Sequence, residues 1–163
     1  MGKKLEDVRK QAKEGTESFK KGAEQGRKAV SDVKQMKRLI DSLPTDVDDE
    51  ITSAAKAVEQ GTKSDAEGYM NSEVSSKIES GRKSMDSSNK AADQQIKNNE
   101  RVQSVFSQMD GIGAFGKNAR GEGRNKVEAS TREFNKAIQE NQENTRQADE
   151  EFKKNLSDIS STF

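Results

Sequence analysis

The first forty or so residues carry an apolar side chain or glycine at every position reached by stepping alternately three and four residues along the chain. This seam consists of Leu5, Val8, Ala12, Gly15, Phe19, Gly22, Gly26, Ala29, Val33, Met36, Ile40 and Leu43. Such spacing places one narrow apolar stripe along a helix, as in coiled coils. Pro44, the one proline of the chain, cannot comfortably continue that helix. We therefore expect a helix over residues 3–43 that buries its stripe against other helices.

A second helix is predicted to start directly after Pro44 and to run over residues 46–110. Thr45 is a candidate N-cap, and the first helical turn is acidic, which suits the positive end of a helix dipole. No proline and no pair of adjacent glycines interrupts this stretch. Its weak polar seam near residues 68–72 leaves a competing arrangement open, in which the central helix breaks there and the chain folds into a shorter bundle.

The first two helices are expected to form an antiparallel hairpin. The apolar positions of the second helix begin with Val47, Ile51, Ala54, Val58 and Gly61. A fold at Pro44 pairs residues whose numbers sum to 87, which brings Gly26 opposite Gly61 in either a tight crossing or a soft spot. Charge supports this pairing, because residues 1–40 hold 12 basic and 6 acidic side chains whereas residues 41–80 hold 3 and 10.

The last part of the chain is predicted to contain a glycine-rich loop over residues 111–123 and a third helix over residues 124–161. From Val74 onward the apolar phase of the central helix shifts by about one residue, which would turn a new face toward the third helix. A fold near residue 118 pairs residues whose numbers sum to about 236, and the outer helices would overlap only around residues 72–85. The sequence therefore predicts one all-α domain, 1–163, an elongated antiparallel bundle or coiled coil of three long helices.

The composition disfavours most catalytic and binding chemistry. The 163 residues include no His and no Cys, so the usual ligands of zinc, haem, copper and iron–sulfur clusters are absent. The basic residues are matched by equally many acidic ones, 29 of each, and no aromatic residues interleave with them for base stacking. No apolar run approaches the ~18 residues of a membrane helix. We predict no enzyme activity, no metal or other cofactor, no nucleic-acid partner and no membrane span.

The string at residues 111–117 imitates a phosphate-binding loop. It matches the dinucleotide-binding pattern G-x-G-x-x-G. It also nearly matches the P-loop pattern G-x-x-x-x-G-K-[ST], but Asn118 occupies the last position, where a P-loop needs Ser or Thr. Such loops follow a strand, whereas residues 102–110 have the pattern of a helix. A helix-to-helix connection is the simpler interpretation. The alternative is a nucleotide-binding enzyme, which ATP would stabilise against heat. Ile112 and Phe115 would cap the bundle end or form an exposed apolar tip that touches a partner.

Two segments, KSMDSSNKAAD at 83–93 and VFSQMD at 105–110, together with the seams of small residues, resemble the WXG/LXG-type helical proteins of bacterial type VII secretion and their small helical partners. The Trp-x-Gly turn of that family has no counterpart here. Tyr69 and Glu73 fit the family's Tyr-x-x-x-acidic export pattern, in mid-helix; alternatively, Tyr69 is a seam residue opposite Phe19. The resemblance implies an exported protein, or an adaptor for the helical domain of an exported toxin, without catalysis of its own.

We therefore expect a non-enzymatic helical interaction protein, a secreted substrate or adaptor of a bacterial type VII-like secretion system whose partner is a helical protein. It would be cytoplasmic, or secreted without a cleavable signal peptide. The alternative function is a self-associating structural coiled coil, whose partner is a further copy of the chain. The candidate residues for partner binding or export are Tyr69, Glu73, Phe106, Met109, Ile112 and Phe115.

Overall fold

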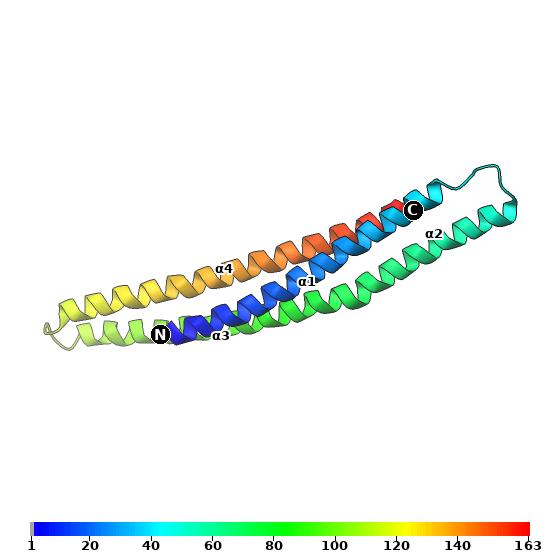
Figure 1. Ribbon diagram of the computed structural model, residues 1–163. Helices are drawn as coiled ribbons and strands as arrows, with labels where there is room; N and C mark the ends of the chain where they lie inside the picture. Colours follow the sequence, from blue (N-terminus) through cyan, green and yellow to red (C-terminus); the bar gives the residue numbers. More distant parts are fainter. Residues whose placement is uncertain (1) are drawn as a thin grey trace. The chain divides into compact units, whose positions relative to one another are not determined.

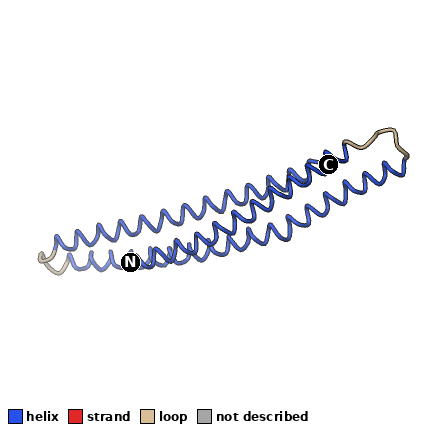
Figure 2. Tube along the Cα trace, viewed as in Figure 1, coloured by secondary structure: helices blue, strands red, loops and turns tan. Residues whose placement is uncertain are grey.

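The computed structural model describes residues 2–163, which form long helices joined by two short connections (Figures 1 and 2). Helix α1 spans Gly2–Asp41. Helix α2, Asp49–Tyr69, continues without interruption through a π-helical turn, η1, Met70–Val74, into helix α3, Ser75–Asp110. Helix α4 spans Lys117–Thr162, and the described residues contain no strand. The predicted all-α fold is confirmed, and the chain does not break at residues 68–72.

Contacts divide the chain into two compact units, and each unit contains a segment of α1, of the central helix and of α4. Unit 1 comprises Met1–Gly15 and Arg82–Asn144, and unit 2 comprises Thr16–Gly81 and Thr145–Phe163. The prediction that α1 and α4 overlap only around residues 72–85 was therefore wrong. In unit 2 the basic side chain of Arg27 pairs with Glu151 of α4. The excess positive charge of α1 is therefore balanced partly by α4 and not by α2 alone.

The core of unit 1 combines an apolar cluster with a buried polar layer. Val8, Ala92, Phe134 and Ala137 pack together from α1, α3 and α4. The polar layer follows one turn away and again joins all three helices: the Ser88 hydroxyl, fully buried, donates to the Val8 carbonyl at 2.9 Å.

Asn141 of α4 completes this polar layer. Its amide donates to the Ser88 hydroxyl at 3.0 Å and to the side-chain carbonyl of Asn89 at 2.7 Å. A buried, satisfied Asn favours the one register in which its partners are met. The layer therefore specifies how α3 and α4 align.

The core of unit 2 brings α1 unusually close to its neighbours at two glycines. A Cβ atom on Gly22 would lie 3.1 Å from Ile78 Cδ1, and one on Gly26 would lie 2.7 Å from Asn155 Nδ2 and 3.5 Å from Met70 Cε. Only glycine permits this approach without displacing a neighbour. Apolar side chains that pack around this contact include Phe19, Met70, Val74, Ile78 and Ile159, all of them buried.

The predicted register of the α1–α2 hairpin was wrong. Gly26 faces Met70 and Gly22 faces Ile78, so that paired residue numbers sum to 96 or 100 rather than 87. A Cβ atom on Gly61 would meet no atom of a neighbouring helix within 4 Å, so the expected glycine crossing does not form. The longer connection, residues 42–48, explains part of this shift, because α2 begins at Asp49 with Asp48 as N-cap and not at residue 46 with Thr45. A hairpin folded symmetrically between Asp41 and Asp49 would pair numbers that sum to 90, so α2 is displaced further along α1 than the connection alone requires.

The π-helical turn lies where the sequence shows a one-residue phase shift, but the residues of the earlier phase, such as Gly61 and Ser72, are exposed in the structure. Upstream, the partly buried face of α2 includes Ala55, Thr62 and Ala66, and downstream the buried residues continue with Met70 and Val74. A π turn inserts one extra residue into the helix. It therefore keeps both stretches facing the interior, and the shift does not mark a change of partner.

The predicted start of the last helix and the register of the α3–α4 hairpin also need correction. Helix α4 begins at Lys117 and includes two of the glycines assigned to the loop 111–123. Asn99 donates to Thr131, and Arg124 donates to the Phe106 carbonyl, so paired numbers sum to 230 rather than 236. The difference is close to one heptad, so similar seam positions meet but the fold point lies nearer residue 115.

Candidate partner-binding surfaces

Helix α2 contributes no buried residue, although it carries a stripe of apolar and small residues. Ile51 is 52% exposed and Val58 is 46% exposed, and Ala54 and Gly61 are also exposed. We call these four residues the lateral stripe. They were predicted to pack against α1. Instead, the face of α2 that packs against the rest of unit 2 is formed by residues that follow these by one position, such as Ala55 and Thr62. The more apolar lateral stripe is therefore left on the side of the helix.

Polar contacts hold the packed face of α2 against α1. The Lys37 ammonium lies 3.3 Å from a Glu59 oxygen and 3.1 Å from one of Asp41. Hydrogen bonds to Asp41 and then to Glu59 raise the pKa of Lys37. The same ammonium lies 5.8 Å from the centroid of the Phe163 ring, within cation–π range. These contacts orient α2 and with it the lateral stripe.

The two residues of the predicted export pattern are both accessible. Tyr69, the last residue of α2, is 38% exposed, and Glu73 lies exposed within η1. Tyr69 lines a groove of about 410 Å³ between α1 and α2, whose apolar wall includes Val33 and Met36. Tyr69 is therefore not a buried seam residue, unlike Phe19, which is 5% exposed.

The other four predicted residues lie in unit 1, at the turn between α3 and α4. Phe106 is partly buried and packs against Gly123, where a Cβ atom would lie 3.0 Å from its ring. Met109 is 40% exposed, Ile112 is 85% exposed and Phe115 is 97% exposed. The sequence left open whether Ile112 and Phe115 cap the bundle or form an exposed tip, and the structure shows an exposed tip.

Arg120 of α4 holds the backbone of the tip in place. The Arg120 guanidinium donates to Asp110 at 2.8 Å, to the Phe115 carbonyl at 2.7 Å and to the Gly113 carbonyl at 3.1 Å. Gly116 supplies the positive φ, 74°, that closes the turn. The turn follows a helix, so it lacks the strand–loop–helix setting of phosphate-binding loops.

Asp110 is the anchor of this arrangement. Hydrogen bonds from Arg124 and then from Arg120 hold the pKa of the Asp110 carboxyl below its ordinary value. Arg124 also donates to the Phe106 carbonyl at 3.0 Å. The tip is consequently pre-organised, since its backbone carbonyls are bound by side chains that are themselves fixed.

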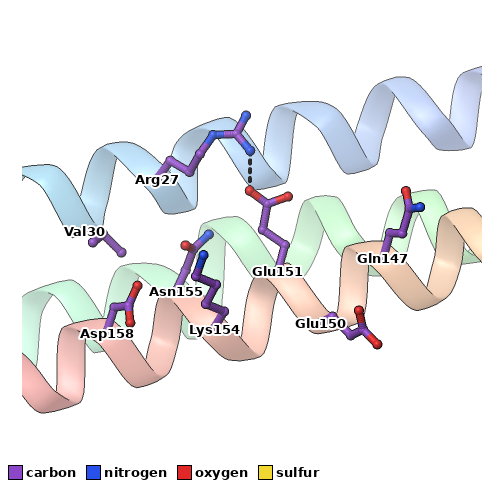
Figure 3. A pocket seen from close by; sticks show the side chains of 8 residues that line it. All are labelled: Arg27, Val30, Gln147, Glu150, Glu151, Lys154, Asn155 and Asp158. Atoms are coloured by element: carbon purple, nitrogen blue, oxygen red, sulfur yellow. Dashed lines mark hydrogen bonds and ion pairs between the residues drawn. The ribbon is translucent and has the colours of Figure 1, made fainter.

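A third surface feature is a polar pocket of about 550 Å³ between α1 and α4 in unit 2 (Figure 3). Figure 3 shows Arg27 reaching from α1 to Glu151. Asn155 is 4% exposed, and its Nδ2 atom, close to Gly26, has no hydrogen-bond partner. The other lining residues include Glu150, Lys154 and Asp158, so charges of both signs are mixed. This mixture does not select a ligand of either sign.

Among residues 2–163 no group of three or more acidic residues is arranged to hold a metal ion. Within the same range no helix is both long enough and apolar enough to cross a bilayer. Comparisons with protein-family models, with curated proteins and with solved structures find no match.

Proposed function

We propose that this chain is a non-enzymatic helical interaction protein that binds a helix of another protein along the lateral stripe. The observation that carries the proposal is that α2 buries none of its residues while it exposes Ile51 and Val58. Stripe residues recur at positions i, i+3, i+7 and i+10, the spacing by which one helix packs against another. Fully burying an exposed aliphatic side chain contributes about 1.5–3 kcal/mol, and Ile51 and Val58, which are about half exposed, would gain roughly half of that.

The stripe also has room for close approach. A Cβ atom on Gly61 would meet no neighbouring atom within 4 Å, so a partner helix can come near the backbone there. The groove beside Tyr69 continues on the same flank of α2, because Tyr69 lies five helical turns from Ile51 at nearly the same angle. A partner helix of several turns would therefore contact the stripe and the groove together.

The interaction is tested with a photo-crosslinking amino acid at position 58, incorporated in the cells that produce the protein. We expect crosslinks to a helical segment of one defined partner. Val58→Glu should abolish co-purification of that partner, whereas Gln60→Glu, which adds the same charge on another exposed face of α2, should leave it intact. Equal recovery of the partner by both variants would reject the lateral stripe as its binding surface.

The proposal includes the export route implied by the resemblance, with the protein acting as a substrate or adaptor of a type VII-like system. Its support is that Tyr69 and Glu73 are both accessible to a recognition factor. A π-helical turn begins directly after Tyr69, and such turns are frequent at functional sites. Tyr69→Ala and Glu73→Ala should each reduce export into the medium, while Glu79→Ala on the same continuous helix should not. Undiminished export of the first two variants would remove the secretion role.

A further inference from the structure

The tip between α3 and α4 is built as a rigid apolar projection. Ile112 and Phe115 are 85% and 97% exposed, and Arg120 fixes the backbone between them through the carbonyls of Gly113 and Phe115. Binding would still order the Phe115 side chain, but the backbone that carries it is already held and loses little conformational freedom. The tip thus has the features of a preformed binding element.

The free end of the α1–α2 hairpin in unit 2 offers a matching depression. A pocket of about 310 Å³, here called the end pocket, opens beside the connection. Its apolar lining residues are Ile40, Leu43, Pro44, Val47, Ile51 and Ala55. Leu43 and Ile51 remain 46% and 52% exposed, so this apolar surface is incompletely covered within the chain.

The two surfaces carry opposite charge. Residues 39–58, which surround the end pocket, include one basic and five acidic residues, a net charge of −4. Residues 102–127, which form the tip and its supporting helices, include four basic and two acidic residues, a net charge of +2. Opposite charge around an apolar contact steers association and disfavours pairing of two tips or of two pockets.

We propose that the α3–α4 tip of one copy docks in the end pocket of a second copy, with Phe115 as the inserted side chain. The acidic residues around the pocket then face Lys117 and Lys126 near the tip. Because every copy carries one tip and one pocket, the contact is head-to-tail, and repeated contacts produce a linear assembly or a closed ring. This inference goes beyond the proposed function, since the tip plays no part in the lateral stripe and the end pocket shares only Ile51 with it.

The test uses two variants that each disable one surface. Phe115→Asn removes the inserted ring, and Thr52→Arg places a bulky positive side chain at an exposed position lining the end pocket. In sedimentation velocity we expect the full chain to form larger species as concentration rises, with weaker association in high salt. Each variant alone should associate at least tenfold more weakly, and Phe115→Leu should retain association.

The equimolar mixture of the two variants decides the geometry. Phe115→Asn keeps a working pocket and Thr52→Arg keeps a working tip, so together they should form a dimer and nothing larger. A full chain that stays monomeric at every concentration, a Phe115→Asn variant that associates like the parent, or a mixture without dimer would each overturn the proposal. A monomer that instead binds anionic vesicles through Phe115 would assign the tip to a membrane surface and would also overturn it.

Discussion

Replacing Gly61 by alanine should stabilise the isolated protein. Gly61 lies inside α2, and a Cβ atom there meets nothing within 4 Å. The substitution therefore adds no contact and no clash, and it removes the entropic cost of glycine in a helix interior, about 0.8–1.0 kcal/mol. For a chain of this size that corresponds to a rise in Tm of about 2–4 °C. Urea unfolding followed by far-ultraviolet circular dichroism measures the change in unfolding free energy.

The matched variant is Gly26→Ala, which has the same intrinsic gain in helix propensity. Its Cβ atom would lie 2.7 Å from the Nδ2 of the buried Asn155, and such overpacking costs about 1–3 kcal/mol. We therefore expect Gly26→Ala to destabilise while Gly61→Ala stabilises. If Gly61→Ala were the destabilising variant, α2 would contact α1 through the lateral stripe, and the observed register would be refuted.

Three further predictions concern unit 1. Phe134→Ala should lower the unfolding free energy by about 3–5 kcal/mol, because Phe134 is 1% exposed in the apolar cluster; a loss below ~1 kcal/mol in urea unfolding would contradict that packing. Asn141→Ala should cost about 2 kcal/mol, because two hydrogen bonds of about 1 kcal/mol each are lost; unchanged stability would mean that the polar layer does not contribute. The contribution of Asp110 to tip stability should be fully present above the ordinary pKa of an aspartate and be lost as pH falls through its lowered folded-state pKa. NMR titration of the Asp110 carboxyl, together with hydrogen exchange of the tip amides, measures both changes. Tip amides whose exchange does not change as Asp110 is protonated would contradict its binding to Arg120 and Arg124.

The helical class of the fold could be predicted from the sequence because the seam of α1 is continuous and one proline ends it. The registers could not be predicted in the same way. Heptad spacing constrains which face of a helix is buried but not which heptad meets which, and an error of about one heptad between α3 and α4 leaves similar seam positions paired. The residue that specifies the alignment is Asn141, a polar residue in an apolar seam, through its hydrogen bonds to Ser88 and Asn89.

The sequence does not predict the exposure of the lateral stripe, because Ile51 and Val58, the larger aliphatic residues of α2, have the spacing of a hairpin interface. The packed face instead includes Thr62 and Ala66 and is positioned by the downstream core, through the extra residue of the π turn. The phase shift at Val74 is visible in the sequence, but the residues upstream of it that carry the earlier phase lie on the exposed side of α2.

Thiol labelling at the lateral stripe most directly tests whether a partner covers it. The chain contains no cysteine, so Val58→Cys and Gln60→Cys each introduce one unique thiol at an exposed position of α2. Both thiols should react readily in the purified protein. In the cells that produce the protein, we predict that labelling of the position-58 thiol slows at least tenfold while that of the position-60 thiol does not. Equal labelling of the two thiols in those cells would contradict a partner helix on the stripe.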